Sequence, residues 1–302
     1  MDKNLFVLLL GNEAGEPVDL YQTLLKKEAL TAGKAAGFDV QIAFARAFNQ
    51  FAVLRRHLSE ATSPVDAVLT EPWNASTMKL MLNELKGRTG LVLLNAWDPA
   101  VETSRAEWGA GLPLGCVSTP HEEVGKLQGA QLSVLVPSGG AVLVVTGPAR
   151  SSAAQERLQG LRSTIRADVT VHDTEASQWA EAAGIAAFND WYRVFKSRHE
   201  DIHAIAGQSD DVAVGARAAA CAVPNAEHAA MFSKAKLLGV GGCPGFGKDL
   251  VDDGALNATI TLPASTGMAI GLLERFWRDG TPPPPQSFTT VAPYPETSTR
   301  RA

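Results

Sequence analysis

The chain has 302 residues, 45% of them apolar and 20% charged, and carries a net charge of −5. Its length is typical of two domains of roughly 100–200 residues each, and its composition excludes a disordered chain, a collagen and a coiled coil. No apolar run approaches the roughly 20 residues that span a bilayer. The 27 Lys and Arg form no long basic block, so we expect no nucleic-acid partner.

The three cysteines, Cys116, Cys221 and Cys243, form no CxxC pair, and an odd number does not close a disulfide framework. We expect them to be buried as small apolar residues, and we predict no metal site and no cofactor. The apolar run Leu5–Leu10 is shorter than the roughly 7–15 residues of a signal-peptide core. It is typical of a buried first strand.

Short apolar runs alternate with helical patterns along the chain. The predicted strands are Leu5–Leu10, Asp39–Ala43, Ala67–Leu69, Leu91–Asn95, Ala141–Thr146, Asp168–Val171, Ala204–Ala206, Lys236–Val240 and Ala258–Thr261. The predicted helices are Leu20–Ala36, Phe51–Glu60, Glu122–Val136, Ala153–Thr164, Ser177–Arg198, Val212–Ala222 and Ser265–Arg278. Apolar strands joined by helical crossovers form parallel sheets that helices cover on both faces.

The strand pattern restarts in the middle of the chain. A fresh strand begins after the turn-forming run Pro137–Gly140, and the predicted strands are too many for one sheet. The proline run Pro282–Pro285 predicts an extended connector into a final strand near Phe288–Val291. The sequence therefore predicts an α/β fold of two similar halves.

In open parallel sheets a ligand binds beyond the carboxyl ends of the strands, so the loops there are the candidate site. These loops carry Trp73 and Trp97, and Trp179 falls just inside the following helix. The C–H face of a sugar stacks on an aromatic ring while its hydroxyls bond polar groups, so the tryptophans favour a sugar-like ligand. The alternative is that each one caps the core, because tryptophan is usually largely buried.

One segment, His199–His203, matches the zinc-protease pattern HExxH. That chemistry needs both histidines on one face of a helix, with the glutamate as base. Here the motif falls where a helix ends and a strand begins. We therefore expect a solvated helix end rather than a metal site.

Two other segments resemble catalytic motifs incompletely. Gly242–Lys248 has the spacing GxxxxGK of a phosphate-binding loop, but Asp249 replaces the Ser or Thr that holds magnesium, and Pro244 lacks a backbone donor. Gly207–Asp211 begins like the nucleophile elbow GxSxG and lacks the closing glycine. We therefore expect neither segment to be catalytic, and nucleotide binding at Gly242–Lys248 stays as an alternative.

Segments in the second part of the chain resemble, in order, those of one protein family. They are Gly125–Gly129, Val144–Gly147, Ser152–Gly160, Gly207–Ala216, Leu238–Gly242 with Pro244, Val251–Gly254, Ala258–Pro263 and Gly267–Ile270. On these segments the chain resembles the periplasmic sugar-binding proteins of ABC importers. It is most similar to the ribose/galactose-type group, whose domain also serves LacI-type repressors as a sensor.

The resemblance implies the type I periplasmic binding protein fold. In that fold two Rossmann-like lobes with parallel sheets are joined by a three-stranded hinge, and the ligand lies in the cleft between them. The N-terminal lobe would comprise residues 1–119 and 263–286, and the C-terminal lobe residues 120–262 and 287–302.

The resemblance also implies a set of ligand-binding residues. Arg157 matches the arginine that bonds ligand hydroxyls or the ring oxygen, although an arginine–glutamate pair on the helix surface is the alternative. Trp179 matches an aromatic position. The other candidates are Asn12, Tyr21, Trp73, Asn95, Trp97, Arg150, Ser209, Gly241 and Thr261.

Two positions depart from the family pattern. Gly241 and Asn95 stand where many members have a ligand-binding aspartate. The pocket would then lack two carboxylates, which puts ribose, glucose or galactose in doubt. A less hydroxylated ligand, or an anionic one facing Arg150 and Arg157, is the alternative.

These observations predict a solute-binding protein and no enzyme. We expect it to capture a small polar ligand (a sugar, polyol or sugar acid) by hinge closure and to deliver it to the membrane permease of an ABC importer or to a sensor receptor. We expect a monomer in the periplasm, its export signal having been removed. The first alternative is a cytoplasmic ligand sensor or regulator of the same fold without a DNA-binding part. The second is a nucleotide-dependent enzyme that uses Gly242–Lys248.

Overall fold

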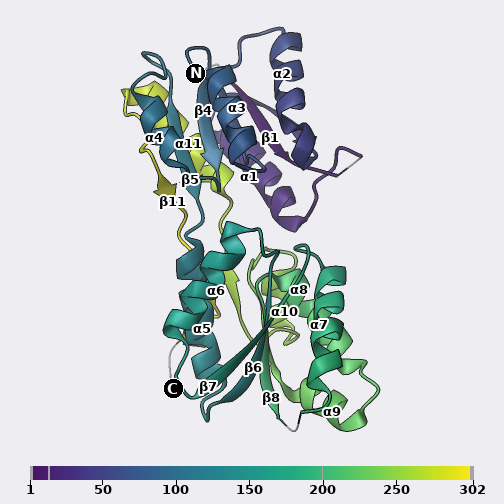
Figure 1. Ribbon diagram of the computed structural model, residues 1–302. Helices are drawn as coiled ribbons and strands as arrows, with labels where there is room; N and C mark the ends of the chain where they lie inside the picture. The colour runs from purple at the N-terminus through teal and green to yellow at the C-terminus, as the bar shows by residue number, and fades with distance from the viewer. Residues whose placement is uncertain (1–2, 13, 199, 300–302) are drawn as a thin grey trace. The chain divides into compact units, whose positions relative to one another are not determined.

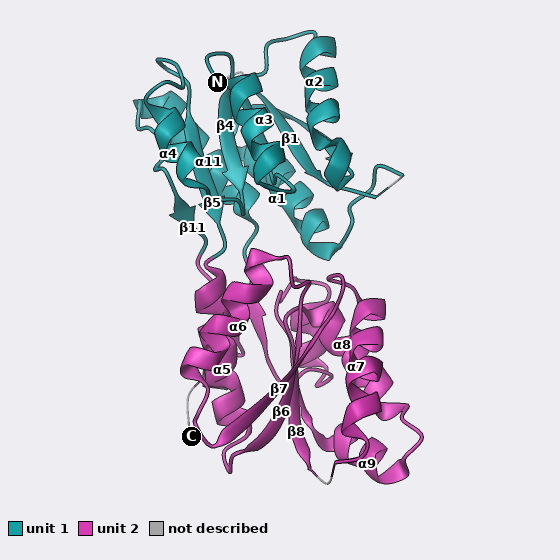
Figure 2. Ribbon diagram, viewed as in Figure 1, with its two compact units in different colours: residues 1–119, 263–289 teal, residues 120–262, 290–302 magenta. Residues whose placement is uncertain are grey.

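The computed structural model describes residues 3–12, 14–198 and 200–299, and they form two compact units. Unit 1 comprises residues 1–119 and 263–289, and unit 2 comprises residues 120–262 and 290–302 (Figure 2). The chain therefore passes between the units after Thr119, Leu262 and Thr289. Residues 287–289, assigned from the sequence to the second lobe, lie in unit 1 because β11 (Ser287–Phe288) pairs with β5 (Leu114–Ser118).

Unit 1 is built on one parallel sheet (Figure 1). Its spatial order is β11, β5, β4 (Gly90–Leu94), β3 (Ala67–Thr70), β1 (Lys3–Leu10) and β2 (Phe38–Ala45). In the centre Leu5 of β1 lies opposite Val40 on one side and Ala67 on the other. Because the strands are parallel, the loops that follow β1, β3, β4 and β5 all meet at one edge of the sheet.

Helices cover both faces of this sheet. Alternate residues of β1, Leu5 and Val7 among them, pack against α1 (Leu20–Ala36) and α11 (Ser265–Asp279). Phe6 and Leu8 face the other way, toward α2 (Gln50–Glu60), α3 (Ala75–Leu85) and α4 (Pro99–Arg105), with a short 3-10 turn at Ala47–Asn49. Side chains point alternately to the two faces of a strand, and each face packs against the apolar stripes of its helices. The sheet therefore has one core layer on each face.

The side chains that begin these helices sit on the loops at the carboxyl edge of the sheet. Asp19 caps α1, Asn74 caps α3 and Asp98 caps α4, each by accepting a hydrogen bond from a backbone N–H of the first turn. Such caps stabilise a helix start by roughly 1 kcal/mol. They fix where each loop ends and therefore where the neighbouring loop residues point.

Unit 2 repeats the plan with a smaller sheet. The order is β7 (Val169–Glu175), β6 (Gly140–Thr146), β8 (Ile202–Gly207) and β9 (Lys236–Leu238), all parallel. A second, two-stranded sheet pairs β10 (Thr259–Thr261) with β12 (Ala292–Tyr294) in antiparallel fashion. A short helix α10 (Gly247–Asp252) and a 3-10 turn at Glu296–Thr299 complete the unit.

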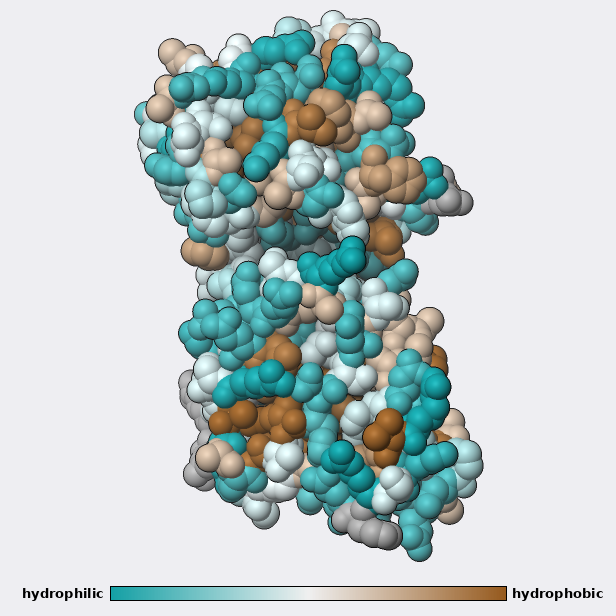
Figure 3. All heavy atoms as spheres, viewed as in Figure 1, coloured by the Kyte–Doolittle hydropathy of each residue, from teal (hydrophilic) through white to brown (hydrophobic). Residues whose placement is uncertain are grey.

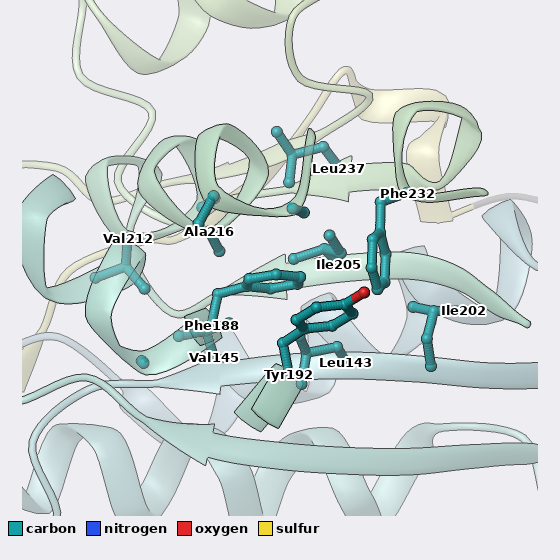
Figure 4. Close-up of a cluster of buried hydrophobic side chains, with 14 of the residues drawn as sticks. Leu143, Val145, Phe188, Tyr192, Ile202, Ile205, Val212, Ala216, Phe232 and Leu237 are labelled. Atoms are coloured by element: carbon teal, nitrogen blue, oxygen red, sulfur yellow. The ribbon is translucent and has the colours of Figure 1, made fainter. Parts of the chain in front are cut away.

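Two layers of helices bury this sheet as well. Val142 and Val144 of β6 pack against α5 (His121–Leu135) and α6 (Ser152–Thr164). The other face packs against α7 (Glu181–Phe195), α8 (Asp210–Cys221) and α9 (Ala226–Lys234). Figure 4 shows Phe188, Tyr192 and Phe232 together in this core, with the rings of Phe188 and Phe232 edge to face at 5.1 Å.

The α/β fold with two parallel sheets predicted from the sequence is confirmed. One expectation about the cysteines is wrong: Cys116 is buried, but Cys221 is exposed because it ends α8, and Cys243 is half-buried in a loop. The face drawn in Figure 3 is mainly hydrophilic with scattered hydrophobic patches. None of the described helices combines the length and apolarity needed to cross a bilayer.

Candidate functional site

Polar side chains gather at the carboxyl ends of the central strands of unit 1. Glu71 follows β3, Asn95 follows β4 and Thr119 follows β5. The first turns of α1 add Tyr21 and Gln22. We call these five residues the unit 1 cluster. They come from four separate segments of the chain, and the order of the strands brings them together.

Asn95 is the centre of the unit 1 cluster. Its amide nitrogen donates to the Tyr21 hydroxyl at 3.4 Å and to Glu71 Oε1 at 3.3 Å. Its amide oxygen accepts hydrogen bonds from the backbone N–H and the hydroxyl of Thr119, at 3.2 and 3.3 Å. The backbone of Asn95 has φ of +52°, a left-handed conformation that asparagine tolerates better than most residues.

Glu71 lies beside Asn95, half-buried, and the sequence analysis did not select it. Its Oε2 accepts a hydrogen bond of 2.7 Å from Gln22 Nε2, and the Gln22 side-chain oxygen accepts one of 3.1 Å from the backbone of Leu10. Burial raises the pKa of Glu71 to about 7, and the charge of Asp19 adds to the rise, while the bonds from Gln22 and Asn95 oppose it. The carboxyl group therefore titrates near neutral pH.

The remaining candidates of unit 1 lie on its exposed loops. Asn12 is exposed, and its side-chain oxygen accepts backbone hydrogen bonds from Ala14 at 2.9 Å and Glu16 at 3.1 Å, so it holds the loop after β1. Trp73 is 58% exposed and Trp97 is 40% exposed. Phe48, which the sequence analysis missed, is 78% exposed in the 3-10 turn that follows β2. Neither tryptophan caps the core.

In unit 2 the structure brings Arg157 and Trp179 together. The Arg157 guanidinium lies 5.2 Å from the centre of the Trp179 ring, the geometry of a cation–π contact. Only 6% of Arg157 is exposed, and its Nη1 donates to the Gln208 carbonyl at 2.5 Å. Arg157 is therefore buried rather than exposed on the surface of α6. We call Arg157, Trp179, His121, Gln208 and Gly147 the unit 2 cluster.

His121 fixes the guanidinium of Arg157 from α5. Its Nδ1 lies 3.4 Å from Arg157 Nε and 3.3 Å from Nη2. Burial lowers the pKa of His121 to about 2, and the positive charge of Arg157 contributes. The ring is therefore neutral at physiological pH, so its Nδ1 can accept a hydrogen bond from the arginine. This contact could not be predicted from the sequence, because His121 lies on α5 and Arg157 on α6.

The Trp179 ring rests on the end of β6, where the chain has a glycine. A Cβ atom at Gly147 would lie 2.0 Å from the ring carbon Cη2 of Trp179, far inside contact distance. The backbone N–H of Gly147 also donates to the buried Gln208 side chain at 3.0 Å. Gly147 is therefore required for the ring to lie where Arg157 contacts it.

We predict that Gly147→Ala displaces the Trp179 ring and weakens ligand binding by at least tenfold, about 1.4 kcal/mol. Calorimetric titration measures the affinity, and tryptophan fluorescence reports the displaced ring. Gly271→Ala is the matched control, because a Cβ atom there on α11 meets nothing within 4 Å. Equal affinities for both variants would contradict this role of Gly147.

The loop after β9 turns around a buried carboxyl group. Asp210 accepts hydrogen bonds from the Thr259 hydroxyl at 2.6 Å and from the Gly242 backbone at 2.7 Å. Burial raises the pKa of Asp210 to about 6. Gly241 has φ of +136°, and a Cβ atom there would lie 2.8 Å from Asp210 Oδ2. The turn therefore has no room for the aspartate that many family members carry at this position.

Three further candidates of unit 2 have other settings. Ser209 caps α8 by accepting a hydrogen bond of 3.1 Å from the backbone of Val212. Thr261 donates to the Ala292 carbonyl at 3.1 Å and so joins β10 to β12. Arg150 is exposed on the loop after β6. The two hydroxyls thus have local structural partners.

The incomplete catalytic motifs form no reaction centre among the described residues. His199 lies outside them, His203 is part of β8, and Glu200 pairs with His172 at 2.9 Å. The described residues contain no group of three or more side chains that could hold a metal ion. In the loop Gly242–Lys248, the backbone N–H of Gly242 is taken up by Asp210.

Two cavities lie at the opposite, amino ends of the strands. One, of about 300 Å³ in unit 1, is lined by Asn4, Asp39 and His57 among others. The other, of about 560 Å³ in unit 2, is lined by residues that include Ile202 and Lys236. Neither includes a member of the two clusters, so they are separate from the candidate site.

Comparisons with known proteins agree with this architecture. Residues 17–266 match the model of the periplasmic binding protein domain. No curated protein matches the sequence. Three similar solved structures are an ABC transporter periplasmic solute binding protein from Actinobacillus succinogenes 130z with bound D-allose, the periplasmic binding component of the arabinose ABC transporter from Shewanella sp. ANA-3, and the fructose-binding periplasmic domain of a hybrid two component system.

The three structures share the fold at low identity. The Actinobacillus protein is 16% identical with a TM-score of 0.77, and the match covers 99% of both chains. The Shewanella protein is 19% identical with a TM-score of 0.77, covering 98% of this chain and 93% of that one. The fructose-binding domain is 19% identical with a TM-score of 0.75, covering 96% and 90%. The chain belongs to the periplasmic binding protein domain family.

Proposed function

We propose that this chain is a solute-binding protein that captures a small polyhydroxylated ligand between its two units and delivers it to an ABC importer in the periplasm. The observation that carries this proposal is the Arg157–Trp179 pair, a buried guanidinium against an aromatic ring at the carboxyl end of the unit 2 sheet. The unit 1 cluster occupies the corresponding edge of its own sheet. Ligands of open parallel sheets bind at such edges.

The chemistry of the two clusters suits a sugar or polyol. An aromatic ring takes the C–H face of a sugar, while a guanidinium, amides and a carboxyl group bond its hydroxyls. Ligand contacts to both units would favour a closed form over an open one, because closure is driven by the differential affinity for the two states. A binding role needs no catalytic group, and we propose none.

The similar structures support a neutral, hydroxyl-rich ligand. One holds D-allose, one belongs to an arabinose transporter, and one is described as fructose-binding. All three are binding proteins or domains. The ligand of this chain is therefore sought among sugars and polyols first, with a sugar acid as the charged comparator.

A thermal-shift screen tests the proposal. The panel contains D-allose, L-arabinose, D-fructose, D-ribose, myo-inositol and D-gluconate, each at high excess. A ligand present at 100 times its Kd stabilises the folded state by about 2.7 kcal/mol, which raises the melting temperature by several degrees. The proposal predicts such a rise with at least one neutral compound. No rise with any member of the panel would overturn it.

A second candidate is the ligand-sensing domain of a receptor. The fructose-binding relative belongs to a two component system, and it covers 96% of this chain. The two roles share the same ligand chemistry and differ in the partner that reads the closed form. Stimulation of the ATPase of the importer in vesicles by the ligand-loaded protein supports transport. Binding to a receptor ectodomain without such stimulation supports sensing.

A further inference from the structure

Within the unit 1 cluster, Asn95 and Glu71 differ in what they can still bind. Both ends of the Asn95 amide are engaged, by Tyr21 and Glu71 on the nitrogen and by Thr119 on the oxygen. Each Glu71 oxygen accepts a single hydrogen bond, from Gln22 or from Asn95. A carboxylate oxygen accepts about two. Glu71 therefore has acceptor capacity left, while Asn95 has little.

Among the described residues of unit 1, no cation forms an ion pair with Glu71, since the ion pairs there involve other carboxylates. Its neighbours are two neutral amides, the Tyr21 hydroxyl and the carboxylate of Asp19. A half-buried carboxylate without a cation gains from every further donor that reaches it. Asp19 itself caps α1, and burial raises its pKa too.

We propose that Glu71 is the carboxyl group of unit 1 that contacts the ligand, that Gln22 and Asn95 position it, and that it takes hydrogen-bond-donating hydroxyls and rejects anionic groups. This rests on the proposed solute-binding function and deepens it, because it selects neutral sugars and polyols over sugar acids. Glu71 thereby supplies a carboxylate in a cluster where Asn95 replaces the aspartate of many family members.

If Glu71 contacts the ligand, ligand affinity depends on the ionisation of Glu71 and therefore on pH. A purely structural role of Glu71 would not produce this pH dependence. Hydroxyl donors favour the carboxylate form, so ligand affinity rises as the pH rises through the Glu71 pKa of about 7 and falls below it. With full coupling to one group at that pKa, affinity at pH 8 exceeds affinity at pH 6 by roughly tenfold. Asp19 and Tyr21 are the other titratable groups of this region. In the described structure, neither of them forms a hydrogen bond with the Glu71 carboxyl group.

The experiment measures Kd by calorimetry at pH 6, 7 and 8, using the neutral compound of the panel that gives the largest thermal shift and D-gluconate as the anionic probe. We expect Glu71→Gln to weaken binding of the neutral compound at least tenfold at pH 8 and to abolish its pH dependence. Glu71→Asp keeps a carboxylate and should retain the pH dependence at reduced affinity. Glu102→Gln, an exposed carboxylate on α4, is the matched control and should change nothing.

The positioning role of Asn95 has its own readout. Its hydrogen bond to Glu71 lowers the pKa of that carboxyl group, so removing it should move the midpoint of the affinity–pH profile to higher pH. Asn95→Gly removes the amide and accommodates the positive φ of this residue. A lower affinity with an unmoved midpoint would show that Asn95 does not act through Glu71.

The outcomes separate this inference from the function it rests on. If no neutral compound binds the wild-type protein, the proposed function falls and this inference falls with it. If a neutral sugar binds the wild type, and a folded Glu71→Gln variant binds it as tightly as the wild type at pH 8, this inference alone is overturned. Tighter binding of D-gluconate than of every neutral compound would also overturn it.

Discussion

Arg157→Ala is expected to weaken ligand binding by at least tenfold, about 1.4 kcal/mol. The guanidinium is held by the Gln208 carbonyl, the neutral His121 ring and the face of Trp179, so it is fixed before a ligand arrives. A preorganised donor loses little conformational entropy on binding, and a guanidinium offers several donors in a fixed fork. Calorimetric titration of the best neutral compound of the panel measures the loss.

The same substitution also removes a buried hydrogen bond to Gln208. Leaving that carbonyl without its donor should cost about 1–3 kcal/mol of stability, which denaturant unfolding measures separately from binding. Arg157→Lys is the matched control, because it keeps the charge and loses the fork. It should bind more tightly than Arg157→Ala and more weakly than the wild type. An Arg157→Ala protein that folds and binds with wild-type affinity would refute the site.

Trp179→Ala is expected to weaken binding by at least tenfold as well. The ring is half-buried on Gly147 and presents an aromatic surface beside Arg157. Its removal takes away the stacking partner of a sugar and one of the contacts that orient the guanidinium. The same titration measures the affinity.

Trp179→Phe is the matched control for this position. Phenylalanine retains an aromatic face at reduced area, so its affinity should stay within a few-fold of wild type. If Trp179→Phe loses as much affinity as Trp179→Ala, then the indole contributes through something other than stacking. If neither variant changes the affinity, the ligand does not contact the ring.

The order of strands and helices could largely be predicted from the sequence, because buried parallel strands are short apolar runs and their crossover helices are periodic. The strand β5 was missed, since Gly115 interrupts its short apolar run and Pro113 precedes it. The helix α3 was missed although its cap Asn74 and its buried Met78 and Leu82 are readable signals.

The site was harder to predict than the fold. Arg157 and Trp179, which the family resemblance selected separately, lie in contact. The network of Asn95 with Tyr21 and Thr119 joins segments far apart in the sequence. Only the strand order decides such contacts. Glu71 was missed even though a signal existed: an acidic residue directly after a buried strand, at the edge where ligands bind. The exposed Trp73, two residues later, was selected as the candidate on this loop instead.

Many family members have an aspartate at the positions of Gly241 and Asn95. In this structure a carboxyl group from another part of the chain lies next to each of these two residues. Gly241 is held in a turn that Asp210 fills, so a carboxylate is present there although it is engaged with Thr259 and Gly242. Asn95 lacks the charge of an aspartate, and its amide donates a hydrogen bond to the carboxyl group of Glu71. Each unit therefore has a carboxyl group beside the position concerned, and the Glu71 carboxyl group in unit 1 favours hydroxylated ligands over anionic ones.

The most direct test of the central claim is a calorimetric titration of the wild-type protein and of the Arg157→Ala/Trp179→Ala double variant with the neutral sugars and polyols of the panel. The proposed function predicts saturable one-to-one binding of at least one compound to the wild type. The expected Kd is near or below about 1 μM, equivalent to a binding free energy of about −8.2 kcal/mol. It predicts a loss of at least tenfold in the double variant. Saturable binding that is equally tight in a folded double variant would contradict the account.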